Sequence, residues 1–530
     1  MKAKKLAALL IGAVTALVSL PNVPAGATAV PNEVDYAEVD ANWAKLLQYS
    51  MYFYDANMCG TGVADNTLLP WRGNCHVCDA KVPLVPMDEQ EIGTNLSAAF
   101  IKQYKDILDP DGDGYVDVSG GFHDAGDHVK FGLPEAYAGS VVSWGYYEFR
   151  DAYKETGQDT HVETICRYFC DYFMRSTFRD DSGDVIAFCY QVGDGAIDHK
   201  YWQSPEIDAM ARPAFFATAD LPTTDDVAEA AACLAINYYN FKDTDKKYAE
   251  KCLDYAKALF NFAAANEKKV GAGADGPASF YTSSKWEDDY CFAAGWLYLI
   301  TEDHWYLEEA LPYMDYYAPP GYVLCWNDMW NGVGIVYGLI QDIYPEVCEE
   351  CRVAIGRGQY EVLNFWEMSA KGINARIDGE VGKITPAGYF WLDQWGSARY
   401  NTAAQFTALV YDKYQNGKDL YKPSHPDYYF SDWAVGQMEY LLGDNPLERC
   451  YVVGFSENSV RFPHHRAASG LTMAEDPAEH KHVLWGALVG GPGKDDNHSD
   501  TTNDWILNEV TIDYNAAFVG AAAGLYARYG

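Results

Sequence analysis

The amino-acid sequence predicts an all-α fold, because apolar residues recur at helical spacing over most of its length. The alternation of apolar and polar residues that is typical of half-buried strands is scarce. Gly, Asp, Asn and Pro crowd the segments between the apolar stretches, so we expect long loops to join the helices. These observations predict a helical assembly of about a dozen helices with elaborated loops on one side.

The elements follow one another without a Ser/Thr/Pro-rich linker, a low-complexity block or an abrupt charge shift between residues 30 and 530, which predicts one domain. The clearest helical periodicity covers residues 43–54, 136–155, 227–240, 248–262, 290–300, 332–343, 403–414, 433–442 and 516–529.

Composition excludes several classes of protein. Of the 530 residues, 49% are hydrophobic and 22% are charged, which argues against a largely disordered chain and against a many-pass membrane protein. The 76 acidic residues against 39 basic ones give a formal net charge of -37, which would repel the phosphate backbone of a nucleic acid. The 41 Tyr and 15 Trp residues suit both a packed core and platforms for sugar rings.

The N-terminus has the order of a secretory signal. Lysines in the first five residues precede an apolar run over residues 6–20, and small residues follow up to Ala29. The apolar run is too short for a comfortable membrane span. We therefore expect residues 1–29 to be a signal peptide cleaved after Ala29 or Ala27, and residues 30–530 to be exported as a soluble protein without a membrane partner.

The 13 cysteines do not resemble a disulfide framework, because most lie singly inside helical patterns. Cys348 and Cys351 form an isolated C-x-x-C in a helical stretch, which we interpret as structural rather than redox-active.

One loop carries a pair of carboxylates suited to acid or base chemistry. Asp124 and Asp127 lie three residues apart between glycines in the loop of residues 120–131, so that both can converge on one water molecule. A helix-capping Asp or a metal-binding loop gives a similar pattern, and the loop alone leaves these alternatives open.

A second group of polar residues lies toward the C-terminus. Glu509 precedes the last apolar helix, where partial burial can raise the pKa of a carboxylic acid enough for it to donate a proton. A first-turn Glu favoured by the helix dipole is the structural alternative. His464, His465 and Arg466 form a compact polar trio that can orient hydroxyl groups or a carboxylate.

Together these motifs resemble glycoside hydrolase family 9, the family of inverting cellulases. The Asp124/Asp127 loop, the Pro-His-His-Arg run and the block from Asp500 to Glu509 occur in the order and setting of that family, and the similarity extends over essentially the whole mature chain. Further matches are residues 191–195, 391–400, 442–446 and 486–492, together with Asp198-His199, Trp202 and Pro205-Glu206. The resemblance implies an (α/α)6 barrel with an open cleft built from loops at one end.

The resemblance also implies residue roles. Asp127 matches the general base that activates water, Asp124 its partner on the same water, and Glu509 the general acid. The residues expected to hold the sugar are His464, Arg466, Asp500 and Arg399, with Tyr201, Trp202 and Trp286 as stacking platforms. Inversion requires room for water between acid and base, so we expect the carboxyl groups of Glu509 and Asp127 to lie roughly 6.5–9.5 Å apart.

A zinc site is expected near the catalytic loop. Cys59, Cys75, His76 and His123 offer thiolate and imidazole ligands, although spacing alone leaves Cys78 as a competing ligand. The four positions match a Cys2His2 zinc site of some family 9 enzymes, and we expect a structural zinc that pins the N-terminal loop against the catalytic one. No organic cofactor is expected.

Calcium is a further expectation. Asp109, Asp111, Asp113 and Asp117 occupy the first, third, fifth and ninth positions of a calcium loop, but the twelfth position is Gly120 instead of Glu. The match is therefore incomplete, and an Asp-rich solvated turn is the alternative. By similarity to the family, Asp243 and Asp288 are candidates for a second calcium site.

The expected activity is that of a secreted endo-β-1,4-glucanase whose partners are cellulose or soluble β-glucan chains. Acid and base alone do not select side groups, so xyloglucan or mixed-linkage glucan remains an alternative substrate, and a non-catalytic carbohydrate-binding protein is the alternative of another class. No dockerin repeat is seen within the sequence, and we expect a monomer.

Overall fold

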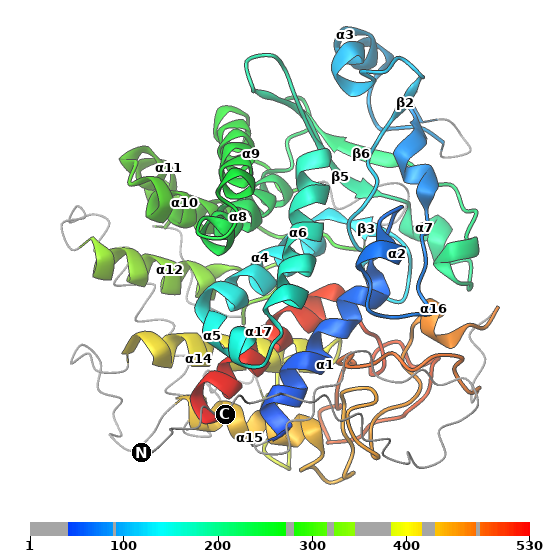
Figure 1. Ribbon diagram of the computed structural model, residues 1–530, viewed down its shortest axis with the longest axis vertical. Coiled ribbons are helices and arrows are strands. Elements are labelled where there is room, and N and C mark those ends of the chain that lie inside the picture. Colours follow the sequence, from blue (N-terminus) through cyan, green and yellow to red (C-terminus); the bar gives the residue numbers. More distant parts are fainter. Residues whose placement is uncertain are drawn as a thin grey trace, which may run out of the picture.

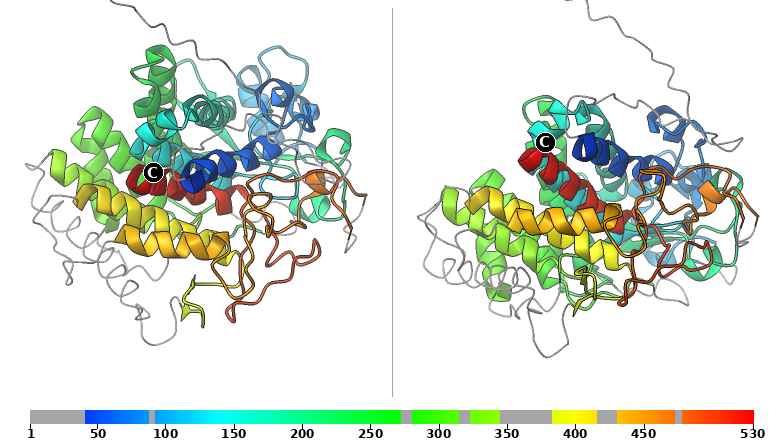
Figure 2. Two further views of the ribbon diagram at one scale, coloured as in Figure 1. Left: turned by 60° about the horizontal axis from the view of Figure 1, so that its bottom comes forward. Right: turned by 90° about the horizontal axis from the view of Figure 1, so that it is seen from below.

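Six helices pack side by side in a closed ring in the computed structural model, which describes residues 41–87, 92–271, 280–314, 323–344, 383–415, 430–472 and 478–530. Each helix contacts the next, and the last returns to the first (Figures 1 and 2). In ring order they are α4 (Gly132–Glu148), α8 (Thr224–Phe241), α10 (Glu287–Thr301), α12 (Trp330–Ile343), α14 (Ser397–Gln415) and α17 (Ile512–Tyr529).

The inner helices have no polar face, because they are surrounded by other helices. Nearly every residue of α4, α8 and α17 is buried, and small residues let their backbones approach closely. A Cβ atom on Gly145 of α4 would lie 3.0 Å from the Cα of Gly520 of α17, closer than normal packing allows. These sequences therefore suit only the interior of a helical assembly.

A second layer of helices covers the ring from outside. Its amphipathic members each bury one face, α6 against α4 and α8, and α9 against α8. The described outer helices are α1 (Ala41–Asn57), α6 (Asp159–Arg175), α9 (Lys246–Ala265), α11 (His304–Met314) and α15 (Phe430–Leu442). The shorter helical segments are α2 (Val63–Asn66), η1 (Val77–Lys81), α3 (Ala98–Leu108), α5 (Arg150–Glu155), α7 (Gly195–Asp198), η2 (Pro205–Ile207) and α16 (Arg466–Ser469).

Every helix expected from periodicity is present, with ends that differ by a few residues. The expected helix of residues 136–155 is divided into α4 and α5, because Phe149 adopts the non-helical angles φ -119° and ψ 33°. The expected signal peptide and the Cys348/Cys351 pair lie outside the described residues. No helix in the described segments has both the length and the apolar character needed to cross a membrane.

Short antiparallel strands are the part of the fold that periodicity missed. β5 (Val185–Val192) pairs with β3 (Lys130–Phe131), β4 (Thr177–Arg179) and β6 (Ala214–Ala217) in one sheet. Almost all of β5 is buried, so its two faces do not alternate in polarity. The other strands form two-stranded ribbons: β1 (Val82–Pro83) with β2 (Tyr115–Val116), and β7 (Lys383–Ile384) with β8 (Phe390–Trp391).

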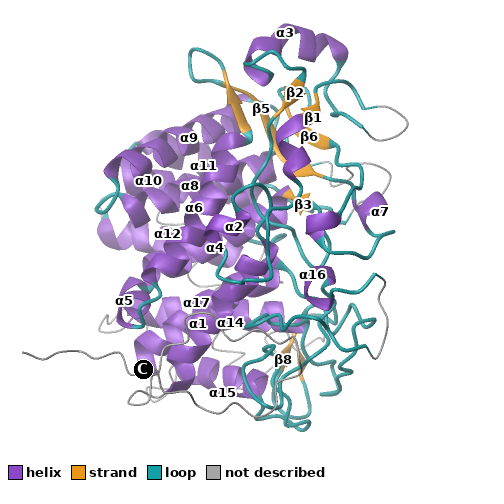
Figure 3. Ribbon diagram, turned by 45° about the vertical axis from the view of Figure 1, so that its right-hand side comes forward, coloured by secondary structure: helices purple, strands orange, loops and turns teal. Residues whose placement is uncertain are grey.

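Long loops gather on one side of the helical assembly, as the sequence predicts (Figure 3). Several of these loops lead directly into the N-terminal ends of the inner helices. The loop of residues 120–131 precedes α4, residues 280–286 precede α10, and residues 392–396 precede α14. Residues from widely separated parts of the chain therefore meet at one end of the ring.

A buried ion network fastens the N-terminal loops to the sheet. The carboxylate of Asp79 in η1 accepts two hydrogen bonds from Arg212, at 2.6 and 3.0 Å, and lies 3.0 Å from Nζ of Lys130 in β3. All three side chains are buried. Burial alone would raise the pKa of Asp79, but the charges of Arg212 and Lys130 hold that pKa well below its usual range.

Asp79→Asn is expected to lower the free energy of unfolding by about 3–5 kcal/mol, because it leaves two buried cations without their shared anion. Urea denaturation followed by circular dichroism measures this change. Glu250→Gln is the control, since it breaks the exposed Lys246–Glu250 pair and should change stability by less than about 0.5 kcal/mol. Equal effects of the two substitutions would contradict the assigned role of the network.

Candidate active site

The loop of residues 120–131, which carries Asp124 and Asp127, is fixed to the C-terminal end of α1. The amide group of Asn57 donates to the carbonyl oxygens of His123 and Ala125, at 2.9 and 2.7 Å. The amide of Asp124 donates to the carbonyl of Val129 at 2.9 Å, which closes the loop upon itself. The backbone around both aspartates is therefore held from inside and outside the loop.

Asp127 is held in its ionised form. One of its oxygens lies 3.0 Å from Nε2 of His199, and the other accepts from the amide of Ala125 at 3.1 Å. Burial alone would raise the pKa of Asp127, but the hydrogen bond from His199 and the positive charge of Arg466 bring it below its ordinary value. Asp127 is thus available to accept a proton at neutral pH.

Asp124 has the opposite electrostatic setting. Its Oδ2 accepts a hydrogen bond of 2.6 Å from the hydroxyl of Tyr281, and its Oδ1 is buried without a hydrogen-bond partner. Burial and the negative charge of Asp127 raise the pKa of Asp124 well above its usual value. Asp124 therefore binds a proton more readily than Asp127 does.

Glu509 precedes α17, as expected, and is half-buried. Its Oε2 accepts hydrogen bonds from Nε1 of Trp395 at 2.6 Å and from the hydroxyl of Tyr514 at 3.2 Å. Burial raises the pKa of Glu509 to about 7, and the charge of Asp127 adds to the effect. A carboxyl group with this pKa can donate a proton near neutral pH.

His464, Arg466 and Trp202 form one wall beside these carboxyl groups. The ring of Trp202 meets that of His464 edge to face with centroids 4.8 Å apart, and its Nε1 donates to Ser469 at 3.0 Å. Nη1 of Arg466 lies 2.7 Å from Oδ2 of Asp198, which belongs to the same segment as His199. Arg466 thus places positive charge on the Asp127 side of the site, where the contact with Asp127 raises the pKa of His199.

Three backbone hydrogen bonds join the loops that carry these residues. The carbonyl of Asp124 accepts from the amide of Ile512 at 2.7 Å, and the carbonyl of Gly126 accepts from Arg466 at 3.2 Å. The amide of His464 donates to the carbonyl of Asn508 at 2.7 Å, next to Glu509. Only glycine fits at position 126, because a Cβ there would lie 2.1 Å from the carbonyl oxygen of His464.

The remaining predicted sugar contacts occupy supporting or peripheral places. Arg399 is buried and pairs with Asp513 at 2.8 Å, behind Tyr514. The carboxylate of Asp500 accepts from the backbone amides of residues 461 and 462, which shapes the approach to His464. Trp286 packs against aromatic rings where α10 meets α11, and among the described contacts none joins it to the carboxyl groups. The side chain of Tyr201 is on the surface.

Sequence reasoning missed the hydrogen-bond partners of the carboxyl groups. His199, Trp395 and Tyr514 lie inside or beside motifs that carry the family resemblance, so those motifs contained a usable signal. Tyr281 lies in a stretch without a recognisable pattern, and only its proximity to Asp124 in the fold reveals it.

The expected zinc ligands converge. One potential ligand atom from each of Cys59, Cys75, His76 and His123 lies within 4.8 Å of the others, and all four residues are buried. Nδ1 of His76 and Nε2 of His123 are 3.0 Å apart. Two sulfur and two nitrogen donors suit tetrahedral zinc. Cys78 is exposed and is not part of this cluster, so the competing ligand set is not assembled.

Three of the four aspartates of the expected calcium loop also converge. One carboxylate oxygen from each of Asp109, Asp111 and Asp113 lies within 4.8 Å of the others. Oδ1 of Asp109 is buried without a hydrogen-bond partner. Asp117 accepts instead from the amide and hydroxyl of Ser119, at 3.0 and 2.7 Å, so the structure does not bring it into this group.

Asp243 and Asp288 are not brought together. Asp243 is exposed just beyond the C-terminal end of α8, whereas Asp288 is buried in the first turn of α10, where its charge acts on Glu229 near the N-terminal end of α8. The length of α8 therefore separates the two aspartates. Burial raises the pKa of Asp288 to about 8 and that of Glu229 to about 8.

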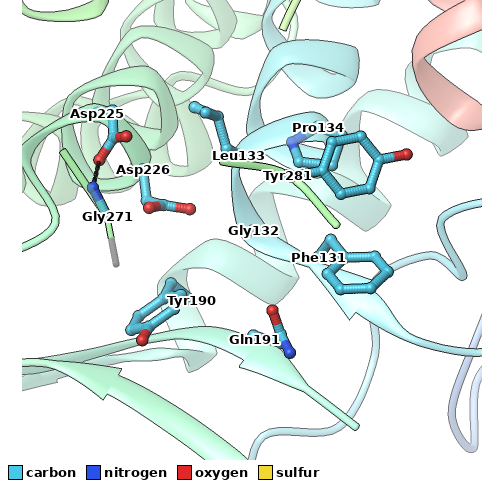
Figure 4. A pocket seen from close by; sticks show the side chains of 10 residues that line it. All are labelled: Phe131, Gly132, Leu133, Pro134, Tyr190, Gln191, Asp225, Asp226, Gly271 and Tyr281. Carbon is cyan, nitrogen blue, oxygen red and sulfur yellow. Dashed lines mark hydrogen bonds between the residues drawn. The ribbon is translucent and has the colours of Figure 1, made fainter. Parts of the chain in front are cut away.

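A small pocket lies at the N-terminal end of α8 and reaches Tyr281, the residue that contacts Asp124. Tyr281, which donates to Asp124, lines one side, and the carboxylates of Asp225 and Asp226 lie on the other (Figure 4). One oxygen of Asp225 accepts from the amide of Gly271 at 2.6 Å. Acidic side chains therefore continue from the site into the end of the barrel.

The six-helix ring, its outer layer and three interacting carboxyl groups at one end define an (α/α)6-barrel glycoside hydrolase. The chain matches glycosyl hydrolase family 9 over residues 43–522 and belongs to that family. The barrel expected from the sequence resemblance is thereby confirmed.

Solved structures of similar proteins agree with this assignment. The catalytic domain of Clostridium thermocellum CelT is 57% identical with a TM-score of 0.84, and the alignment covers 92% of this chain and 97% of that one. The cellulase Cel9M of C. cellulolyticum is 34% identical with a TM-score of 0.74, covering 92% and 99%. Endoglucanase A of Bacillus pumilus is 35% identical in sequence, over 92% of this chain and 67% of its own length.

Proposed function

We propose that this glycoside hydrolase is an endo-β-1,4-glucanase that cleaves cellulose or related soluble β-glucans with inversion at the anomeric carbon. The observation that carries the proposal is the pairing of an ionised Asp127 with a Glu509 whose pKa is about 7. Inverting hydrolysis needs such a base and such an acid. Among similar proteins, endoglucanase CelQ of C. thermocellum was solved in complex with cellobiose and cellotriose, at 32% identity and a TM-score of 0.71.

In the proposed mechanism, Glu509 donates its proton to the glycosidic oxygen while the bond from that oxygen to the anomeric carbon breaks. Asp127 accepts a proton from a water molecule, whose oxygen bonds to the anomeric carbon on the opposite ring face. Asp124, held by the hydrogen bond from Tyr281, orients the same water. The new anomeric hydroxyl comes from the water and has the inverted configuration. Before the next cycle, Glu509 takes up a proton from solvent and Asp127 releases one to it.

Charge and shape support the positions of the sugar contacts. We propose that His464 and Arg466 hydrogen-bond the sugar near the cleavage point and that the ring of Trp202 stacks against it. His464 suits this role because its Nδ1 donates to the carbonyl of Thr502 at 2.6 Å, which fixes the tautomer and leaves Nε2 as an acceptor. Arg399 and Asp500 are positioning residues that act through Tyr514 and the loop before His464.

Export is a further part of the proposal, because the order of basic, apolar and small residues over residues 1–29 is that of a secretory signal. A neutral polymer outside the cell is a suitable substrate for such a protein.

We also propose that Cys59, Cys75, His76 and His123 hold a structural zinc, which would tie the loop after α1 to the catalytic loop. Asp109, Asp111 and Asp113 are the proposed calcium ligands.

Time-resolved NMR of cello-oligosaccharide cleavage is expected to show the α-anomer as the first product. Glu509→Gln is expected to lower kcat by a factor of about 10² to 10⁴, because the leaving oxygen loses its proton donor. Glu250→Gln, on the outer surface, is the control. A β-anomer as first product would contradict the proposed acid and base, and binding without cleavage by the unaltered protein would favour a carbohydrate-binding protein.

The pH dependence of kcat/KM should reflect the two carboxyl groups. Because Glu509 must be protonated, activity is expected to fall as the pH rises through about 7. Trp395→Phe removes a hydrogen bond that favours the ionised form of Glu509, so the pKa of Glu509 rises. The basic limb of the pH profile, where kcat/KM falls, is therefore expected to move up by about one pH unit. Trp505→Phe changes another exposed tryptophan of a neighbouring loop and should leave the limb in place. An unshifted limb in Trp395→Phe would contradict the role of this bond.

Elemental analysis of protein purified without chelators is expected to find one zinc per chain, and removal of zinc is expected to lower Tm because metal binding stabilises the folded state. Addition of calcium should raise Tm, and Asp109→Asn should abolish that increase. Zinc-free native protein with Cys59 in a disulfide would refute the zinc site, and an unchanged response to calcium in Asp109→Asn would refute the calcium site.

A further inference from the structure

A second carboxylate–histidine group lies directly behind the proposed zinc ligands. Asp208, His76 and His128 bring potential ligand atoms within 4.8 Å of one another, and His76 belongs to this group as well as to the Cys2His2 cluster. Oδ2 of Asp208 lies 3.4 Å from Nε2 of His76 and 2.7 Å from Nδ1 of His128. The side chain of Asp208 is completely buried, as is that of His76.

The two nitrogens of His76 face different partners. Nδ1 points toward His123 within the Cys2His2 cluster, at 3.0 Å from its Nε2, whereas Nε2 points toward Asp208. A neutral imidazole that binds a metal through Nδ1 carries its proton on Nε2, where it is a hydrogen-bond donor. The buried oxygen of Asp208 is the acceptor available to that donor, and metal-bound histidines are commonly oriented by such a carboxylate.

The backbone favours a fixed orientation at both ends of this contact. His76 has a left-handed conformation, with φ 44° and ψ 39°, which few residues other than glycine adopt without support. Asp208 is fixed in turn, because its Oδ1 accepts from the amide of Met210 at 2.9 Å. A carboxylate already held in place loses little further freedom when it orients the ring of His76.

Glu206, two residues before Asp208, supports Cys75, the expected zinc ligand that precedes His76. Glu206 pairs with Arg72 at 2.7 Å, and Nη2 of Arg72 lies 3.3 Å from Sγ of Cys75. Two carboxylates of one segment therefore support two adjacent members of the Cys2His2 cluster, one through Arg72 and one directly.

We propose that Asp208 is a positioning residue for the metal centre: it holds His76 in the tautomer and orientation that bind zinc, and through the same oxygen it holds His128, next to Asp127. This inference rests on the proposed zinc site. His128 is itself part of the loop of residues 120–131, and its backbone is fixed there because its amide donates to the carboxylate of Asp198 at 3.1 Å and its carbonyl accepts from Arg212 at 2.7 Å.

Zinc affinity, measured by competition with a chromophoric chelator on the metal-free full chain, tests the proposal. Asp208→Asn removes the negative charge at nearly constant volume and is expected to weaken zinc binding by a factor of about 10 to 100. Asp208→Glu retains the charge and is expected to recover part of that loss. Glu148→Gln is the matched control, because Glu148 is also a buried carboxylate with several donors but lies at the C-terminal end of α4, away from the cluster, where it accepts from Lys413 and Tyr414 of α14.

Thermal unfolding with and without zinc separates metal positioning from general stability. If Asp208 acts through His76, Asp208→Asn should diminish the increase in Tm produced by zinc, whereas Glu148→Gln should lower both melting temperatures and keep that increase. Zinc binding by Asp208→Asn within about threefold of the unaltered chain would overturn the role of Asp208 while leaving the zinc site intact. Failure of the unaltered chain to bind zinc would refute the zinc site itself and this inference with it.

Discussion

Backbone hydrogen bonds between loops fix the geometry on which the proposed chemistry depends. The loop of Asp124 and Asp127 is joined to the segment after Glu509 through Ile512, and to the loop of His464 through Gly126. Main-chain atoms have far less freedom than long side chains, so carboxyl groups a residue or two from these bonds keep a constant separation. The six-helix ring makes the bonds possible, because it delivers the N-terminal ends of α4 and α17 to the same place.

Differences in surroundings, more than differences in residue type, give the three carboxyl groups their separate properties. Asp127 has a hydrogen bond from His199 and the positive charge of Arg466 beside it, and its pKa falls. Asp124 has burial and the negative charge of Asp127, and its pKa rises. Glu509 has burial with two donors to one oxygen, and its pKa settles at about 7. Neighbouring acids cannot all ionise together, so each group's protonation depends on the others.

The sequence predicted what is contiguous and missed what the fold assembles. Apolar periodicity located the helices, and local motifs located Asp124, Asp127 and Glu509, because these signals lie within one segment. β5 escaped notice because a strand buried on both faces loses the alternation that identifies strands. Tyr281 escaped because its contact with Asp124 spans 157 residues. Asp243 and Asp288 were paired by resemblance, but the length of α8 separates them.

Concentrating acidic groups at one end of the barrel makes every buried charge depend on a partner. Helix N-termini favour nearby carboxylates by only about 0.3–1 kcal/mol, less than the several kcal/mol that burying a charge costs. Asp513 is compensated by Arg399, at 2.8 Å. Asp288 and Glu229 are less well compensated, so they retain protons up to a pH of about 8. A bound proton removes the charge that burial disfavours in such groups, which links the stability of this end of the barrel to pH.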